Sequence, residues 1–271
     1  MKISYQGEPG AYSEQAVRDL FGSAAEPLPR PTFRSTFEAL WSGEAARAVV
    51  PLENSTAGLV AEPTDLLLEQ SVHVVSECVL PIRHCLLGLP GERLDEVRIV
   101  WSHPQALAQC TAFLAHHRLA AVAEYDTAGS AKKLAAQRPK ATAAIASRGA
   151  GELYGLAVLA ADVQNDASNA TRFVALSREP GKPGGNKTSI AFTLEPHVGT
   201  LHAALGALAR NGLNVTRVVS RPHLAPWQPV FHLDFVGGPG AQALEELAVL
   251  TTRLWVLGSY EGAVKSATES T

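Results

Sequence analysis

Apolar residues follow two different periods along the first 180 positions of the chain. Short apolar runs, such as those at 48–52 and 97–101, are typical of buried strands, whereas the apolar residues between 16 and 21 recur at the spacing of one helix face. Segments of the two kinds alternate, which predicts an α/β fold with largely parallel sheets. The predicted strands are 3–6, 48–52, 72–80, 82–89, 97–101, 120–124, 141–146 (which also fits the start of a short helix) and 173–176, and the predicted helices are 13–21, 33–41, 63–69, 104–114, 127–137 and one that begins near 147.

A segment rich in proline and glycine at 179–186 ends this pattern, because regular structure must stop there. The pattern beyond it predicts a strand, a helix, two strands, a helix and a strand, which is the order of a small ferredoxin-like (βαββαβ) domain. The sequence therefore predicts a first domain at 1–180, a linker at 181–187 and a second domain at 188–271. The elements of the second domain are expected at 188–194, 199–210, 215–220, 230–236, 241–252 and 254–258.

Composition narrows the class of protein. Of the 271 residues, 46% are hydrophobic and 18% are charged, which is enough apolar material for packed cores. The formal net charge of −3, without a cluster of Lys and Arg, argues against nucleic acid as a partner. No apolar run reaches the roughly 18 residues of a membrane span, so we expect no membrane partner.

The N-terminus and the cysteines predict a cellular compartment. The chain enters a strand-like pattern at once, without the basic start and apolar segment of a signal peptide. Cys78, Cys85 and Cys110 are odd in number and lack C-x-x-C spacing, which is typical of free thiols in a reducing environment. We therefore expect a cytoplasmic protein.

Polar side chains gather where predicted strands meet loops. The loop at 165–173 carries two amides, a hydroxyl and a guanidinium directly before an apolar run, and the polar segment 53–58 follows another strand. Ligands of open α/β sheets bind at the carboxyl ends of strands, which favours a binding cleft here. The alternative is a strand entry in which Asn and Ser serve only as turn formers.

Two further turns carry candidate chemistry. The glycine turn at 7–12 precedes a helix for which Ser13 is the expected N-cap, and free N–H groups there would suit an anion, although an ordinary strand-turn-helix explains them as well. Pro104 fits the first turn of its helix, so that Ser102 and Gln109 are expected to face one cleft. The neighbouring His103 is more often structural than catalytic in such a position.

Four motifs in order resemble the prephenate dehydratase family over nearly the full length of the chain. They are Gly7-Glu8-Pro9-Gly10-Ala11-Tyr12-Ser13-Glu14, Pro51-Leu52-Glu53-Asn54-Ser55 with Gly58, Ser102-His103-Pro104-Gln105-Ala106-Leu107 with Gln109-Cys110, and Thr171-Arg172-Phe173. The resemblance implies a two-lobed catalytic domain similar to periplasmic binding proteins, with one lobe at about 1–77 plus 165–180 and the other at about 78–164. It also implies that the second domain is an ACT domain.

The implied activity is the decarboxylating dehydration of prephenate to phenylpyruvate, water and carbon dioxide in phenylalanine biosynthesis. The reaction is driven by aromatisation and requires no cofactor and no metal. The resemblance makes Thr171 the catalytic residue, either as proton donor to the departing hydroxyl or as an orienting group. Arg172 is expected either to clamp a carboxylate or to form an ion pair outside the cleft. The implied substrate-binding residues are Asn54, Ser55, Ser102, Gln109, Asn169 and Arg172.

The resemblance also implies feedback by phenylalanine, bound at a dimer interface of a homodimer or homotetramer. The expected effector residues are Gly199, Thr200, Leu201, Asn214, Ser220 and Arg221. The chain departs from the family at two places: Val219 replaces a glutamate of the effector motif, and Asn165-Asp166 replaces an Asp-Asn pair. Two other functions stay open, arogenate dehydratase and a non-catalytic amino-acid-sensing or solute-binding protein built from the same folds.

Overall fold

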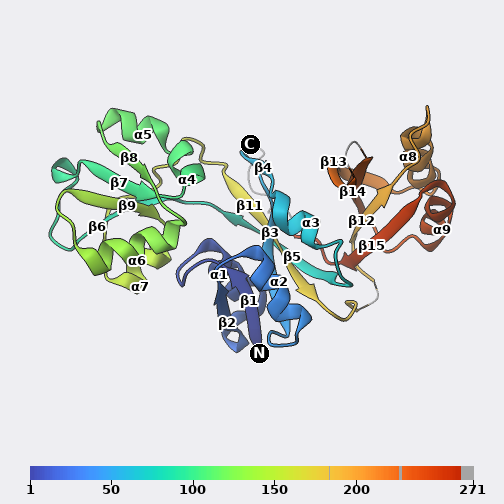
Figure 1. Ribbon diagram of the computed structural model, residues 1–271, viewed down its shortest axis with the longest axis horizontal. Coiled ribbons are helices and arrows are strands. Elements are labelled where there is room, and N and C mark those ends of the chain that lie inside the picture. Colours follow the sequence, from blue (N-terminus) through green and yellow to red (C-terminus); the bar gives the residue numbers. More distant parts are fainter. Residues whose placement is uncertain (183, 226–227, 264–271) are drawn as a thin grey trace, which may run out of the picture. The chain divides into compact units, whose positions relative to one another are not determined.

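The computed structural model describes residues 1–182, 184–225 and 228–263, and the chain forms two compact units within them (Figure 1). The first unit comprises Met1–Val60 and Val79–Phe173, and the second comprises Ala61–Cys78 and the described residues from Val174 onward. Two strands, β5 (His73–Pro81) and β11 (Ala170–Ser177), have residues in both units. Pro183 of the predicted linker and the end of the predicted second domain, 264–271, lie outside the described residues.

The first sheet contains the N-terminal strand β1 and has the strand order β2-β1-β3-β11-β5. Strand β1 (Lys2–Gln6) lies parallel to both β2 (Glu26–Arg30) and β3 (Arg47–Asn54), and the short β4 (Gly58–Leu59) returns along the end of β3. The helices α1 (Tyr12–Phe21) and α2 (Phe33–Trp41) connect these strands, with a 3-10 turn at Gly22–Ala24. Residues of this region that are fully buried include Ile3, Phe37, Leu40 and Val49.

The second sheet of the first unit is mixed, with the order β10-β6-β9-β7-β8. Strand β7 (Ile99–Ser102) is parallel to β8 (Ala120–Ala123) and β9 (Thr142–Ala146), whereas β6 (Cys85–Gly88) is antiparallel to β9 and β10 (Ala157–Ala160). The expectation of largely parallel sheets is wrong for this one, because hydrophobic periodicity contains no information about strand direction. The segment predicted at 141–146 as either a strand or the start of a short helix is a strand, β9.

Helices cover both faces of the second sheet, since alternate residues of β9 belong to different hydrophobic clusters. Ala143 and Ile145 pack with the cluster that includes α4 (Pro104–Ala108) and α5 (Thr111–His116). Ala144 and Ala146 pack with the cluster that includes α6 (Thr127–Gln137) and α7 (Arg148–Tyr154). A 3-10 turn at Leu94–Glu96 precedes β7.

Three predicted helix details in the first unit are wrong. The single helix expected at 104–114 is two helices, which are separated at Gln109 and Cys110. The sequence suggests Thr127 as the cap of the helix predicted at 127–137, but Asp126 caps α6, because its carboxylate accepts a hydrogen bond from Gly129 N. Helix α1 begins one residue before Ser13, with Ala11 as the N-cap and no side chain capping it.

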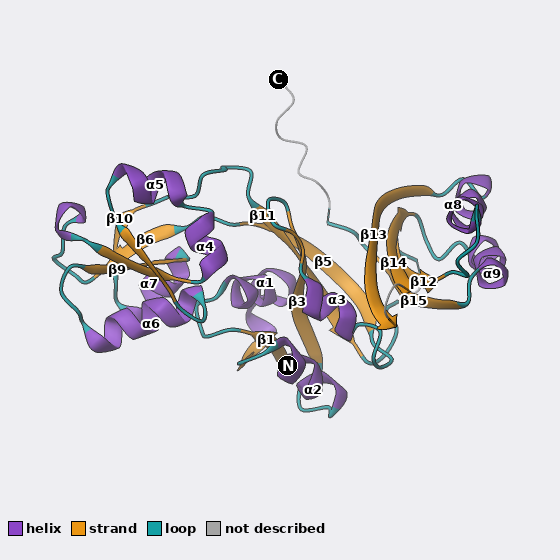
Figure 2. Cartoon of the chain, turned by 45° about the horizontal axis from the view of Figure 1, so that its top comes forward, coloured by secondary structure: helices purple, strands orange, loops and turns teal. Residues whose placement is uncertain are grey.

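The second unit contains the predicted βαββαβ order, with antiparallel strands in the order β13-β14-β12-β15. Helices α8 and α9 lie on the same side of this sheet (Figure 2). The side chains of Ile190, Phe192, Leu233 and Phe235 pack with residues of these two helices in one hydrophobic cluster. The elements are β12 (Lys187–Thr193), α8 (Thr200–Arg210), β13 (Asn214–Ala225), β14 (Gln228–Val236), α9 (Ala241–Leu250) and β15 (Arg253–Tyr260), and the unit also holds α3 (Ala61–Leu66).

The other face of this sheet is polar, and ionic contacts connect it with α3 and β5. Arg221 binds the Asp65 carboxylate through two nitrogens, at 2.8 and 2.6 Å. Lys187 lies 2.9 and 3.0 Å from the two carboxylate oxygens of Glu77, which is almost fully buried. The ion pair between Arg221 and Asp65 therefore fixes α3 to β13 within the second unit.

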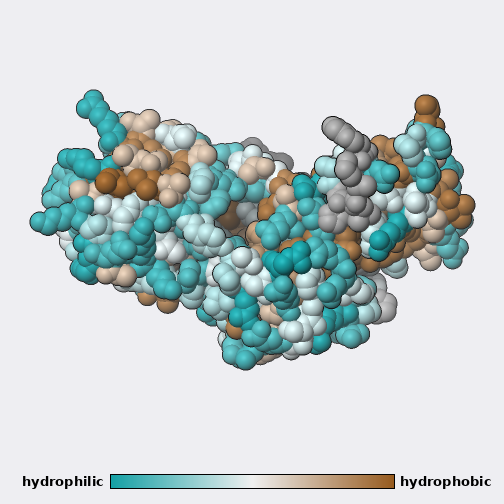
Figure 3. Space-filling model, in the orientation of Figure 1, coloured by the Kyte–Doolittle hydropathy of each residue, from teal (hydrophilic) through white to brown (hydrophobic). Residues whose placement is uncertain are grey.

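The surface mixes hydrophilic and hydrophobic residues, and the face in Figure 3 shows apolar side chains in separate patches. Within the described ranges, no helix is long and apolar enough to cross a membrane. None of the three cysteines, all of them in the described part of the chain, forms a disulfide.

Candidate functional site

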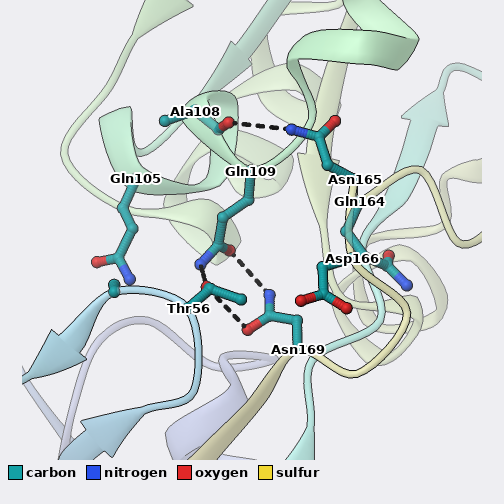
Figure 4. Close-up of a pocket in the computed structure, with 9 residues that line it drawn as sticks. Thr56, Gln105, Ala108, Gln109, Gln164, Asn165, Asp166 and Asn169 are labelled. Carbon is teal, nitrogen blue, oxygen red and sulfur yellow. Dashed lines mark hydrogen bonds between the residues drawn. The ribbon is translucent and has the colours of Figure 1, made fainter.

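A cavity of about 320 Å³ lies in the first unit and is lined mainly by polar side chains (Figure 4). Three chain segments meet around it: the turn after β3, helix α4 with the residue that follows it, and the loop that leads into β11. These are the segments in which the sequence placed its strand-end polar groups. The lining residues are Thr56, Ala57, Gln105, Ala108, Gln109, Gln164, Asn165, Asp166 and Asn169.

Asn54, the last residue of β3, is oriented by the backbone of the turn that follows it. Its Oδ1 accepts hydrogen bonds from Thr56 N at 3.1 Å and from Ala57 N at 2.9 Å. Only the oxygen of the amide accepts such bonds, so the nitrogen of this buried side chain must face the opposite way. Nδ2 donates there to Asn169 Oδ1 at 2.8 Å, to Thr171 Oγ1 at 2.9 Å and to Ala170 O at 3.1 Å.

Two further amides continue from Asn54 into the cavity wall. Asn169 Nδ2 donates to Gln109 Oε1 at 3.0 Å, and Gln109 Nε2 donates to Thr56 Oγ1 at 3.0 Å (Figure 4). Asn169 is 2% exposed and Asn54 is 5% exposed, so the bond between these two amides is shielded from solvent, whereas the bond from Gln109 to Thr56 is exposed. We call Asn54, Asn169 and Gln109 the amide relay, because the orientation of each amide fixes that of the next.

The relay leaves the Thr171 hydroxyl with its proton available. Thr171 is the second residue of β11 and is 8% exposed. A hydroxyl has one donor, and its oxygen already accepts from Asn54 Nδ2. Within the described residues no hydrogen bond from the Thr171 proton is found, so this proton is available. Thr171 is not itself among the residues that line the cavity, and Asn54 connects it to Asn169, which does line it. Asn54 thus orients the Thr171 hydroxyl, although the two residues are 117 positions apart in the sequence.

His84 lies directly behind the relay and was not singled out in the sequence. Its Nε2 lies 3.1 Å from Gln109 Oε1, and its Nδ1 lies 3.1 Å from the Tyr12 hydroxyl. Burial lowers the pKa of His84, while the hydrogen bond to Gln109 opposes this shift. Its place in the predicted strand 82–89, where it is followed by the apolar residues Cys85, Leu86 and Leu87, is the sequence signal that could have identified it.

The comparisons with known proteins give the family. The prephenate dehydratase family model matches residues 3–181. The chain belongs to the prephenate dehydratase family. It is 40% identical over 277 residues to arogenate dehydratase/prephenate dehydratase 2, chloroplastic, of Arabidopsis thaliana, covering 96% of this chain and 72% of that protein. It is 40% identical over 282 residues to arogenate dehydratase 2 of Petunia hybrida, covering 96% and 71%.

Two solved structures extend the similarity of this family member over both units. The prephenate dehydratase of Arthrobacter aurescens in complex with L-Phe has a TM-score of 0.89 at 30% identity, covering 100% of this chain and 92% of that one. GqqA, described as a novel type of quorum quenching acylase, has a TM-score of 0.88 at 36% identity, covering 97% and 98%. The resemblance seen in the four sequence motifs is therefore confirmed at the level of the family.

Of the six predicted substrate residues of this family member, two line the cavity, Gln109 and Asn169, and four do not, Asn54, Ser55, Ser102 and Arg172. Ser102 is fully buried, and its hydroxyl donates to Ile145 O at 2.6 Å, which connects two strands of the second sheet. The structure therefore does not bring Ser102 to the cleft that Gln109 faces. Arg172 is 8% exposed, and the alternation of side chains along β11 directs it away from the face of Thr171.

Two other candidates act on the backbone around the site. Ser55 Oγ accepts from Ala170 N at 2.9 Å and so fixes the start of β11 beside the turn after β3. His103 is the N-cap of α4 and accepts from Gln105 N at 3.2 Å, which agrees with the structural interpretation. Burial lowers the pKa of His103.

The contacts of the glycine turn favour the second of its two alternatives, an ordinary strand-turn-helix. Gly10 N donates to the carboxylate of Glu14 at 2.8 Å, so the chain's own side chain takes the place of an anion. Ser147 Oγ donates to Gly10 O at 2.7 Å, and a Cβ on Gly10 would lie 2.8 Å from Ala150 Cα. The glycine is required by this close approach and by its φ of +89°.

The candidate effector residues are spread over both ends of α8. Gly199 and Thr200 begin this helix of 11 residues and Leu201 follows them, whereas Asn214 comes after its end, about 16 Å along the axis. Strand β13 then carries Ser220 and Arg221 back along the sheet. Arg221 donates to Asp65 from Nε and Nη2, and these hydrogen bonds raise its pKa. One chain therefore does not gather all six residues.

Proposed function

We propose that this chain catalyses the decarboxylating dehydration of prephenate to phenylpyruvate, water and carbon dioxide. The observation that carries the proposal is the Thr171 hydroxyl, whose oxygen accepts from Asn54 while its proton stays available. The family supports a dehydratase of this kind. We further propose that the catalytic domain comprises 1–180 as two lobes, and that the sheet and helices after the 181–187 linker form an ACT domain.

The reaction needs oriented donors more than a strong acid. The ring carboxylate leaves as carbon dioxide, its bonding electrons complete the aromatic ring, and the carbon–oxygen bond to the ring hydroxyl breaks. Thr171 donates a hydrogen bond to the oxygen as negative charge develops on it, and solvent supplies the proton that completes the water molecule. The amides of Gln109 and Asn169 orient the substrate at the cavity wall. Each step uses only protein groups and solvent.

Two substitutions at Thr171 test this role. Thr171→Val keeps the shape and removes the hydroxyl, and we expect it to lower kcat by about 10²-fold or more, as for other lost transition-state donors. Thr171→Ser keeps the hydroxyl and should retain most of the rate. The assay follows phenylpyruvate by its absorbance in alkali, with thermal unfolding as the control for folding. Near wild-type turnover by a folded Thr171→Val variant would exclude the proposal.

Arogenate is the second candidate substrate, and one side chain favours it. Asp166 lines the cavity, and hydrogen bonds from Ser168 hold the pKa of its carboxyl below the usual value, so the group is charged at neutral pH. A carboxylate complements the ammonium group of arogenate and not the keto group of prephenate. Several plant relatives are named for arogenate. Asp166→Asn should therefore lower kcat/KM for arogenate more than for prephenate.

The substrate assay should include two control reactions. The first control tests hydrolysis of acylated substrates, because the similar structure GqqA is described as an acylase. A protein that binds prephenate or phenylalanine but turns over none of these compounds would instead fit the amino-acid-sensing alternative. Turnover of prephenate or arogenate alone separates the proposed function from both.

Phenylalanine is the proposed effector of the second unit. The L-Phe complex of the similar Arthrobacter aurescens protein and the shared βαββαβ order support this. Val219, which replaces the family glutamate, removes one anionic acceptor from the proposed pocket. Calorimetry with phenylalanine, together with the mass of the assembly in solution, tests both the effector and the proposed homodimer or homotetramer. A cytoplasmic location stays a prediction, and the Arabidopsis relative is named chloroplastic.

A further inference from the structure

His84 occupies a position between two parts of the first unit that the proposed function has not yet used. The residue lies between β5 and β6 and is 2% exposed, so its ring does not line the cavity. Its backbone N nevertheless donates to Gln164 Oε1 at 2.9 Å, and Gln164 does line the cavity. Both ring nitrogens have a polar atom at 3.1 Å, one in Gln109 and one in Tyr12.

The amide relay determines which ring nitrogen of His84 carries a proton. The backbone N–H groups of the turn after β3 fix Asn54 with its oxygen toward the turn and its nitrogen toward Asn169. Asn169 must then accept through its oxygen, and its nitrogen donates to Gln109 Oε1. Because that oxygen also faces His84 Nε2, only a protonated Nε2 gives an attractive contact there.

Tyr12 supplies the complementary contact at the other nitrogen. Burial raises the pKa of the Tyr12 phenol well above its usual value, so its hydroxyl stays protonated. The hydroxyl has a single proton and two acceptors within reach, Arg83 O at 2.8 Å and His84 Nδ1 at 3.1 Å. When the ring is neutral with its proton on Nε2, the hydroxyl shares this one proton between the two acceptors. The two rings also meet edge to face, with centroids 5.6 Å apart and planes at 77°. Tyr12 thus holds the ring in one orientation.

We propose that His84 is a positioning residue: held at Nδ1 by Tyr12, it donates from Nε2 to Gln109 Oε1 and keeps the Gln109 nitrogen directed at Thr56 and the cavity. The relay and its backbone anchor define the polarity of this chain of bonds, and His84 fixes its outer end. Its kinetic consequence rests on the proposed dehydratase function. Its consequence for the protonation of the ring does not.

Matched substitutions test the kinetic consequence. Met and Gln have similar length and shape, but only Gln can donate to Gln109 Oε1. We expect His84→Met to lower kcat/KM by up to roughly tenfold, the effect of losing one neutral hydrogen bond, and His84→Gln to restore most of the rate. In a Gln109→Met background, His84→Met should have little further effect, because the two residues act in series. Equal losses for His84→Met and His84→Gln, or fully additive losses with Gln109→Met, would overturn the proposal.

Nitrogen-15 NMR of the imidazole rings tests the proposal without any turnover. The signal of His84 is the one among nine histidines that disappears in His84→Gln. A proton on Nε2 supports the proposal, and a neutral ring with its proton on Nδ1 contradicts it. If the wild-type protein converts neither prephenate nor arogenate, the proposed function fails, and this spectrum still decides the role of His84.

Discussion

Asn54→Asp changes one group of the relay and should reverse the direction of the Thr171 hydroxyl. The introduced carboxylate still accepts from Thr56 N and Ala57 N, which lie 3.1 and 2.9 Å from the Asn54 oxygen. Its other oxygen replaces the nitrogen that now donates to Thr171 Oγ1 at 2.9 Å and to Asn169 Oδ1 at 2.8 Å. The Thr171 proton then turns toward the carboxylate and no longer reaches the substrate.

The expected loss is that of one transition-state donor, about 10²- to 10³-fold in kcat at neutral pH. Burial and the neighbouring acceptor oxygens raise the pKa of an introduced carboxyl, and the protonated form can again donate to Thr171. The activity of Asn54→Asp relative to wild type should therefore rise as pH falls, because protonation restores the donor. Steady-state kinetics on prephenate between pH 8 and pH 5 measures this ratio.

Gln105→Glu is the matched control for adding negative charge at the cavity. Gln105 lines the cavity, is exposed and is outside the relay, so its substitution should not produce the pH-dependent recovery. Thermal unfolding shows whether both variants are folded. A folded Asn54→Asp enzyme with kcat close to wild type at pH 8, or with a ratio to wild type that does not change with pH, would refute the proposed polarity of the relay.

Two further substitutions test other parts of the chain. Gly10→Ala should destabilise the first unit by roughly 2–4 kcal/mol, because the left-handed φ and the contact with Ala150 both oppose a Cβ; Gly91→Ala, with the same φ of +89° and no atom within 4 Å, should lower the thermal midpoint much less. In the second unit, burial and then the charge of Arg217 lower the pKa of His232 to about 4. The folded pKa lies below the unfolded value of about 6.5. The contribution of the neutral His232 to the free energy of unfolding is therefore complete above pH ~6.5, and the free energy of unfolding falls by roughly 3 kcal/mol as pH drops toward 4. Chemical denaturation across this range should show a weaker pH dependence in His232→Leu, and an unchanged slope would contradict the assignment.

Local periodicity predicted most of the elements and the order of the second unit. It missed β2, whose sequence Glu26-Pro27-Leu28-Pro29-Arg30 has proline at alternate positions, which is unfavourable inside a sheet. The strand survives because β2 is at the edge, where it pairs with β1 alone. Periodicity also did not predict that β6 is antiparallel to its neighbours, because the direction of a strand depends on the path of the chain between strands.

The sequence predicted the members of the site better than their contacts. The motifs selected Asn54, Gln109, Asn169 and Thr171, and the structure brings these four together in one network of hydrogen bonds. Ser102 had the same kind of motif support, yet its hydroxyl bonds to a neighbouring strand in the core. Whether a side chain faces a cavity or a strand depends on tertiary register, which a motif does not contain.

The amide relay also has a consequence for folding. Its bonds join positions that are 115 and 60 residues apart in the chain, so they close long loops and cannot form locally. Contacts of such sequence separation arise late in folding and contribute to slow rates. A nascent chain gains the site only after β11 has been synthesised, and a fragment that ends before Ala170 lacks the last partners of Asn54. Recovery of activity after refolding is thus a sensitive measure of the final step in assembling the first unit.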